Sequence, residues 1–142
     1  MNKNGPIIII EDDDEDQLFI QEVFQKLKYQ NELIFFSDGE KALEFLNQGT
    51  AVPFIILSDV KMPKLSGLEL RQKLKTDADL TIKCIPYLFF STAISQTEII
   101  KAYSTSVQGF FLKQNSFEEL EKTITVIMEY WTRCAPPTNV SK

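Results

Sequence analysis

Acidic side chains follow two apolar stretches of this sequence, and carboxylates in such places could bind a divalent cation. Glu11 and Asp12 come directly after the run Ile7–Ile10 and open a block of six consecutive acids, and Asp59 ends the stretch FIILSD. Two unit charges about 4 Å apart repel by ~4 kcal/mol at an effective dielectric of about 20, so clustered carboxylates either point apart into water or surround a cation. Because Mg²⁺ typically takes one or two carboxylates plus water, Glu11, Asp12 and Asp59 are candidate Mg²⁺ ligands.

A hydroxyl group and an ammonium group stand after two later apolar runs. Ser91 and Thr92 follow Tyr87–Phe90, and Lys113 follows Phe110–Leu112. Both kinds of group donate hydrogen bonds to an anionic oxygen. A carboxylate nucleophile combined with Mg²⁺, a lysine and a hydroxyl suits phosphoryl transfer onto an aspartate.

The later acids of the block have a simpler interpretation. Asp14, Glu15 and Asp16 are predicted to be solvated residues at a helix N-terminus, where negative charge is favourable. A calcium loop of the EF-hand type is excluded, because Gln17 stands where that loop requires glycine.

The spacing of apolar residues predicts the scaffold that brings these groups together. Five runs are continuous rather than alternating, as is typical of parallel strands covered on both faces: Ile7–Ile10, Leu33–Phe36, Phe54–Leu57, Tyr87–Phe90 and Phe110–Leu112. Segments with helical spacing lie between them, so the pattern favours five β-α units and an α/β fold with a doubly wound parallel sheet. With the strand order 2-1-3-4-5, the polar ends of four strands meet in one cleft, where open α/β sheets bind ligands.

Helix boundaries are also marked in the sequence. Ser95 with Glu98, and Ser116 with Glu119, have the spacing of a capping box, which predicts that helices begin at these serines. The tail from Ala135 contains two prolines and polar residues and is predicted to be flexible.

Composition excludes several classes of protein. The 142 residues are 44% hydrophobic and carry a net charge of −5 without a stripe of Lys and Arg, so neither nucleic acid nor an anionic membrane is an expected partner. Two cysteines and no histidine exclude a zinc site of the usual ligand types and give no disulfide framework. The N-terminal apolar run is too short for a signal peptide, which predicts a cytoplasmic protein with reduced thiols.

The chemistry-bearing residues together resemble the receiver domain of bacterial two-component response regulators. The resemblance depends on Glu11-Asp12, on the stretch DVKMPKLSG from Asp59 to Gly67, on Ser91 and on Lys113. It implies a flavodoxin-like receiver fold over residues 1–134, followed by a flexible tail at 135–142. The segments KTDADLTIKCIP and EYW are similar to those of single-domain regulators that partner phytochrome-type sensor kinases.

This resemblance also implies roles for individual residues. Asp59 is expected to be the phosphoacceptor, and Lys113 is expected to pair with a phosphoryl oxygen. Asp12 and Asp59 would bind Mg²⁺ directly, Glu11 would act mostly through water, and the backbone carbonyl of Lys61 would supply a further ligand.

Two residues are expected to switch conformation after phosphorylation. Ser91 would hydrogen-bond the attached phosphoryl group, and Phe110, at the aromatic position of the family, would change rotamer. Thr92 is the alternative hydroxyl, but counting six residues from Pro86 favours Ser91. A sensor histidine kinase or phosphotransfer protein would donate the phosphoryl group, and output would occur by protein docking, phosphorelay or homodimerisation.

One position departs from the family pattern. Gln114 stands where the family usually has proline after the lysine, often with a cis peptide bond. A cis bond before a residue other than proline costs ~2.5–4 kcal/mol, so the loop is expected to be either trans and displaced or strained and held by its neighbours.

Other functions are also compatible with some of these residues. A phosphatase of the haloacid-dehalogenase type also uses an aspartyl nucleophile and Mg²⁺, but it normally has a second acid where Lys61 stands. A flavodoxin-like electron carrier is disfavoured because the acids after Ile10 would repel its phosphate. A receiver that acts as a constitutive adaptor is a third alternative. We expect a signalling domain without turnover of a separate substrate.

Overall fold

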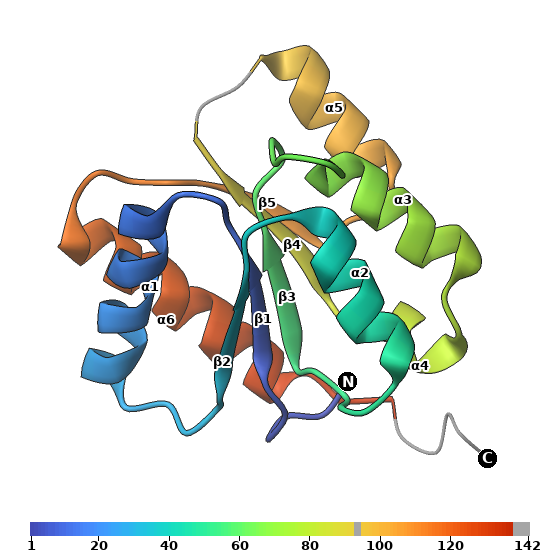
Figure 1. The fold of residues 1–142 in the computed structure, drawn as a ribbon. Coiled ribbons are helices and arrows are strands. Elements are labelled where there is room, and N and C mark those ends of the chain that lie inside the picture. Colours follow the sequence, from blue (N-terminus) through green and yellow to red (C-terminus); the bar gives the residue numbers. More distant parts are fainter. Residues whose placement is uncertain (93–94, 138–142) are drawn as a thin grey trace.

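The computed structural model describes residues 1–92 and 95–137, in which a parallel sheet lies between two layers of helices (Figure 1). The strands are β1 (Ile7–Ile10), β2 (Leu33–Phe36), β3 (Ile55–Ser58), β4 (Tyr87–Ser91) and β5 (Gly109–Leu112). The helices are α1 (Asp14–Leu27), α2 (Gly39–Gln48), α3 (Gly67–Asp77), α4 (Leu80–Lys83), α5 (Gln96–Ser104) and α6 (Phe117–Arg133). Helices α1 and α6 cover one face of the sheet, and α2, α3 and α5 lie on the other.

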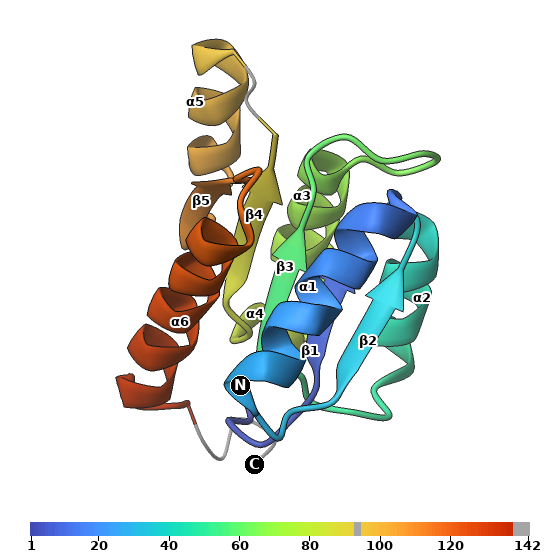
Figure 2. The ribbon, with the colours of Figure 1, turned by 90° about the vertical axis from the view of Figure 1, so that its left-hand side faces the viewer.

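The sheet has the predicted topology. Its strand order is β2-β1-β3-β4-β5, and every neighbouring pair is parallel. In Figure 2 the arrowheads of β2, β3 and β4 point the same way, so their carboxyl ends lie at one edge. Ile10 is in register with Ser58, and Ser91 is in register with Leu112. The residues that follow these positions therefore come together, as the sequence predicts.

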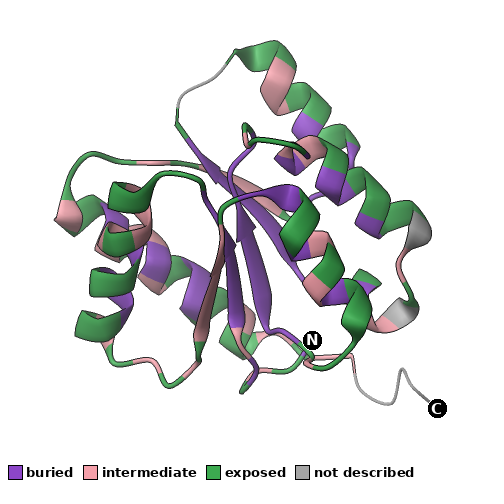
Figure 3. Cartoon of the chain, in the orientation of Figure 1, coloured by how far each residue is buried: buried purple, intermediate pink, exposed green. Residues whose placement is uncertain are grey.

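The continuous apolar runs are explained by burial on both faces of the sheet. Every residue of β1, β3 and β4 is buried, whereas the edge strands β2 and β5 are mostly half-buried (Figure 3). Side chains alternate between faces along a strand. Ile7 and Ile9 pack in the cluster that includes α1 and α6, while Ile8 and Ile10 pack against α2 and α3.

Serine caps begin the helices as predicted. Ser95 and Ser116 accept hydrogen bonds from the backbone N–H groups of Glu98 and Glu119. The reciprocal bond that completes a capping box is formed in α3, where Ser66 N–H donates to the Glu69 carboxylate. Neither this capping box nor the one-turn helix α4 was predicted from the sequence.

Both cysteines, Cys84 and Cys134, are free thiols in this structure. Residues 138–142 of the predicted flexible tail lie outside the described residues. Among the helices in the described ranges, none has the length and apolar character needed to cross a membrane.

Candidate functional site

The backbone ladder places the candidate residues at the carboxyl edge of the sheet. Asp59 follows β3, and its N–H donates to the carbonyl of Ile10 at 2.9 Å. Glu11 follows β1, and its N–H donates to the carbonyl of Phe36 at 2.9 Å. Lys113 N–H donates to the carbonyl of Ser91 at 2.7 Å. Hydrogen bonding therefore continues beyond the strand ends and fixes the positions of these residues.

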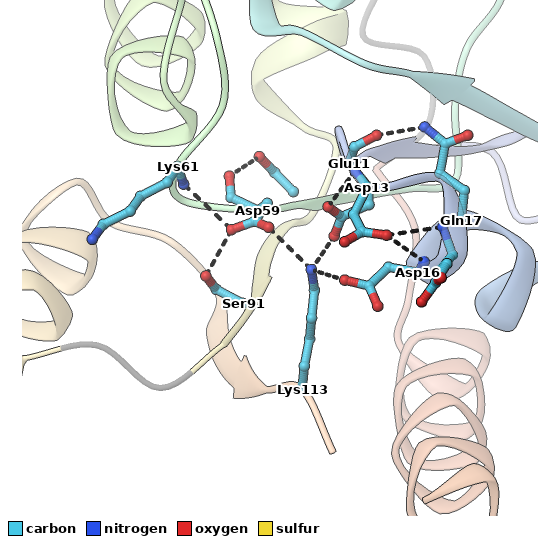
Figure 4. A network of polar contacts seen from close by, with 10 residues as sticks. Glu11, Asp13, Asp16, Gln17, Asp59, Lys61, Ser91 and Lys113 are labelled. Atoms are coloured by element: carbon cyan, nitrogen blue, oxygen red, sulfur yellow. Dashed lines mark hydrogen bonds and ion pairs between the residues drawn. The ribbon is translucent and has the colours of Figure 1, made fainter. Parts of the chain in front are cut away.

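The two carboxylate oxygens of Asp59 have different partners (Figure 4). Oδ1 accepts hydrogen bonds from Ser91 Oγ at 2.7 Å and from the N–H of Lys61 at 3.3 Å. Oδ2 accepts from Lys113 Nζ at 3.0 Å. The side chain is only 11% exposed, and these neighbours hold the orientation of its carboxylate.

The ammonium group of Lys113 lies among three carboxylates (Figure 4). It donates to Glu11, to Asp16 Oδ2 at 2.9 Å and to Asp59 Oδ2 at 3.0 Å. Burial lowers the pKa of Lys113, but the hydrogen bonds with Glu11 and Asp16 outweigh burial and raise the pKa above its ordinary value. The lysine is therefore a fixed positive charge at neutral pH.

Glu11 is the most buried acid of the group. Its side chain is 3% exposed, and one carboxylate oxygen accepts from the N–H of Asp13 at 3.1 Å. Burial raises the pKa of Glu11 to about 7, although the hydrogen bond with Lys113 acts in the opposite direction. At neutral pH this carboxyl group therefore lies near its midpoint, and an added cation would favour the charged form.

The donor set fits a hard divalent cation. Carboxylate oxygens of Glu11, Asp12 and Asp59 all lie within 4.8 Å of one another. Three carboxylates, those of Glu11, Asp16 and Asp59, contact the ammonium of Lys113, and Asp12 lies close to two of them. Oxygen ligands at this separation and an excess of negative charge are what Mg²⁺ and related ions require. The acidic run therefore begins at the edge of the sheet, where a bound cation could neutralise its negative charge.

Gly67 of the DVKMPKLSG stretch is required by close backbone contact. A Cβ atom at this position would lie 2.0 Å from the carbonyl oxygen of Asp59. The N–H of Gly67 donates to the carbonyl of Val60 at 2.8 Å, which closes the loop onto its own start. The first residue of α3 is thus packed directly against the backbone of Asp59.

The structure distinguishes the two candidate hydroxyls. Ser91 is buried with its hydroxyl on Asp59, whereas Thr92 is exposed. Phe110 is half-buried, and its ring centroid lies 5.7 Å from that of Phe89. The side chain of Lys61 is 74% exposed and turns away from Asp59, with Nζ 4.0 Å from Glu98.

The peptide bond after Lys113 is trans, and displacement or strain of the loop stays a prediction. All peptide bonds in the described parts of the chain are trans, including that between Lys113 and Gln114. Gln114 is exposed, and Lys113 still reaches Asp59.

Three contacts of the site were not predicted from the sequence. Asp14, Glu15 and Asp16 lie in the first turn of α1, as predicted, but Asp16 is half-buried and also binds Lys113, which was not predicted. Asp13 caps α1 by accepting from the N–H groups of Glu15 and Asp16, and Gln17 donates its amide to the carbonyl of Glu11. No spacing signal in the sequence marks Asp16, because its role depends on the reach of Lys113 from the end of β5.

Comparisons with known proteins agree with this geometry. The family model of the response regulator receiver domain matches residues 7–125. Response regulator Rcp1 of Synechocystis sp. is 30% identical over 130 residues, which cover 88% of this chain and 87% of Rcp1. The structure of the phosphorylated cyanobacterial phytochrome response regulator RcpA is similar with a TM-score of 0.84 and 28% identity, covering 94% of this chain and 98% of RcpA. The Mn²⁺-bound form of Rcp1 gives a TM-score of 0.81 and 28% identity, covering 93% and 98% of the two chains.

Proposed function

We propose that this chain, which belongs to the response regulator receiver domain family of two-component signalling systems, accepts a phosphoryl group on Asp59 in a Mg²⁺-dependent reaction. One observation carries the proposal. The Asp59 carboxylate is held by Ser91 on one oxygen and by Lys113 on the other, beside acids whose oxygens lie close enough to share a cation.

The phosphoryl donor is a phosphohistidine of a sensor kinase or a phosphotransfer protein. An oxygen of Asp59 attacks phosphorus, an O–P bond forms, the P–N bond to the donor histidine breaks, and the electron pair stays on the imidazole. Lys113 keeps its proton and compensates charge on the phosphoryl oxygens, consistent with its raised pKa. Its three carboxylate contacts hold the ammonium in place before the donor arrives.

Glu11, Asp12 and Asp59 would hold Mg²⁺, with the backbone carbonyl of Lys61 as a further ligand. When bound, this ion supplies positive charge that stabilises the phosphoryl oxygens. The proximity of the three carboxylates supports the assignment, and the similar regulator Rcp1 has a Mn²⁺-bound form.

The phosphorylated domain signals through changes of its own surface. The hydroxyl of Ser91, which now donates to Asp59, would donate to a phosphoryl oxygen, and Phe110 would change rotamer as β4 and β5 adjust. Output would follow through protein docking, phosphorelay or homodimerisation. Similarity to the phytochrome response regulator RcpA supports a phytochrome-type kinase as the donor. A cytoplasmic setting is part of the same proposal.

Labelling with acetyl phosphate and Mg²⁺, followed by intact mass measurement, tests the proposal. The wild-type chain should gain one phosphoryl group, and Asp59→Asn should gain none. Asp14→Asn is the matched control, because Asp14 is exposed in the first turn of α1 and should label like the wild type. Equal labelling of Asp59→Asn would overturn the assignment, and steady turnover of small phosphate esters would favour a phosphatase instead.

A further inference from the structure

A buried guanidinium group lies in a region that the phosphorylation chemistry does not use. Arg71 is in α3 and is 7% exposed. Its Nε donates to the carbonyl of Thr105 at 3.1 Å, and its Nη2 donates to the carbonyl of Ser106 at 2.8 Å. A buried charge is costly unless it is hydrogen-bonded, so these two bonds account for its position.

The two carbonyls belong to the C-terminal end of α5. Thr105 is the C-cap of this helix, and Ser106 has a φ of 62°, in the left-handed region. The last carbonyls of a helix lack partners within the helix and carry partial negative charge, which a guanidinium satisfies. Arg71 therefore joins α3 to the turn that leads from α5 into β5.

Tyr87 extends this contact toward the phosphorylation site. The guanidinium carbon of Arg71 lies 5.5 Å from the centroid of the Tyr87 ring. The hydroxyl of Tyr87 donates to the carbonyl of Gly67 at 3.1 Å, and burial raises the pKa of this hydroxyl, so it keeps its proton. Gly67 is the residue packed against the backbone of Asp59. A continuous set of contacts thus leads from Asp59 to the C-terminal end of α5.

The opposite end of α5 is held much less firmly. The helix begins after Ser95, four residues beyond Ser91, and this first turn is the end that lies farther from β5 (Figure 2). Its first turn carries Glu98, which forms an ion pair of 4.0 Å with Lys61. The Lys61 side chain is 74% exposed, and exposed ion pairs stabilise little.

We infer that Arg71 is a positioning residue that makes the C-terminal end of α5, at Thr105 and Ser106, a fixed pivot for any tilt of this helix on phosphorylation. This inference rests on the proposed phosphorylation of Asp59 and adds how the signal reaches the surface. Movement is confined to the first turns of α5, while the turn into β5 and the start of that strand stay in place. If Arg71 only stabilised the fold as a whole, the two ends of α5 would not differ in their response to phosphorylation.

Hydrogen exchange of the full chain, with and without acetyl phosphate and Mg²⁺, measures the two ends separately. Intact mass of the same samples reports whether Asp59 is labelled. In the wild type, phosphorylation should speed exchange in residues 96–100 and leave residues 101–108 unchanged. The N–H groups of Thr105 and Ser106, which donate to carbonyls of Ala102 and Tyr103, are the reporters of the pivot.

Arg71→Met removes the donors and keeps much of the aliphatic length. Exchange in residues 101–108 should rise about tenfold or more without phosphorylation, as expected from the loss of charge-assisted hydrogen bonds, while β1 is unchanged. Phosphorylation should then speed exchange at both ends of α5. Arg71→Lys should give exchange rates between those of the wild type and Arg71→Met, because one ammonium group replaces the two guanidinium nitrogens that bind the carbonyls. Lys73→Met, an exposed site in the same helix, should match the wild type.

Two results would overturn the inference. One is a wild-type response of equal size at both ends of α5. The other is an Arg71→Met or Arg71→Lys chain whose exchange in residues 101–108 stays at the wild-type rate or rises only together with that of β1. Failure of the proposed function gives a different result, in which Asp59 takes no label while the unphosphorylated variants still differ at residues 101–108.

Discussion

Two buried charged groups of this domain satisfy their charges in opposite ways. At the carboxyl edge of the sheet, the ammonium of Lys113 faces carboxylates that outnumber it, including the buried Glu11. Deeper between α3 and α5, the guanidinium of Arg71 is bound by two backbone carbonyls. The first group carries excess negative charge and is incomplete without a further cation, whereas the charge of the second is stabilised by neutral backbone carbonyls. We infer that carboxylates in excess of their cation mark the reactive site, and a cation held by backbone carbonyls marks a structural support.

Removing the ammonium group of Lys113 should have the largest effect on stability. Lys113→Met should lower the free energy of unfolding by about 3 kcal/mol in Mg²⁺-free buffer at pH 8, because it leaves Glu11 and Asp59 without a counter-charge. Urea unfolding measures the change. Lys122→Met, at a 73% exposed side chain, is the control and should change stability by less than about 0.5 kcal/mol. Equal stability of the two variants would mean that the carboxylates do not depend on Lys113.

Gly67 lies between the two groups, because it packs against the backbone of Asp59 and accepts a hydrogen bond from Tyr87, whose ring contacts Arg71. A side chain added at this position should therefore disturb both groups. In Gly67→Ala the new Cβ would meet the Asp59 carbonyl oxygen, which is backbone and cannot easily move. Stability should fall by about 2 kcal/mol, the usual cost of an overpacked site, and labelling by acetyl phosphate should slow.

Gly109→Ala is the matched control for this substitution. Its Cβ would lie 3.3 Å from the ring of Phe111, a side chain that can adjust, so the loss should be smaller. A Gly67→Ala chain with wild-type stability and labelling would show that the close contact with Asp59 is unimportant.

Mg²⁺ should stabilise the carboxylates around Lys113 and leave the contacts of Arg71 unaffected. At a concentration ten times its dissociation constant, Mg²⁺ should raise the free energy of unfolding by about 1.4 kcal/mol. Thermal or urea unfolding should show this gain in the wild type and in Arg71→Met, whose metal ligands are intact. Asp12→Asn should lose most of the gain with little change in Mg²⁺-free stability, because Asp12 is exposed. A full gain in Asp12→Asn would remove this residue from the metal site.

The pH dependence of stability should give the smallest effect. Burial raises the pKa of Glu11 from 4.5 to about 7, so the folded chain binds more protons than the unfolded chain between these values. In Mg²⁺-free buffer, stability should therefore fall by about 1 kcal/mol as the pH rises from 6 to 7. Glu11→Gln should remove this slope, and an unchanged slope in the variant would assign the titration to another group.

The fold was largely predictable because its signals are local and repeated. Residues Ile7–Ile10 and Leu33–Phe36 became strands with the expected bounds, since a parallel strand with helices on both faces of its sheet carries an unbroken apolar run even at a half-buried edge. The strand-end residues Glu11, Asp59 and Lys113 followed from that topology. The short helix α4 was missed because one turn has too few residues to show helical spacing.

The missed residues depend on tertiary contacts that spacing does not reveal. Asp16 belongs to an acidic helix start, and only the reach of Lys113 from β5 draws it into the site. Arg71 lies among lysines and glutamine on a polar helix, where an exposed position is the ordinary expectation. Its burial is decided by the Tyr87 ring and by the carbonyls at the end of α5. Neither contact could be inferred without knowing how the helices pack.

The dependence of Asp59 phosphorylation on Mg²⁺ tests the central claim most directly. Intact mass should follow acetyl phosphate labelling of the wild-type chain over a Mg²⁺ titration, with a parallel series in EDTA. The account predicts one phosphoryl group per chain, added at a rate that rises with Mg²⁺ and is lost in EDTA. Labelling of Asp59 at the same rate in EDTA would contradict the claim that a divalent cation completes this site.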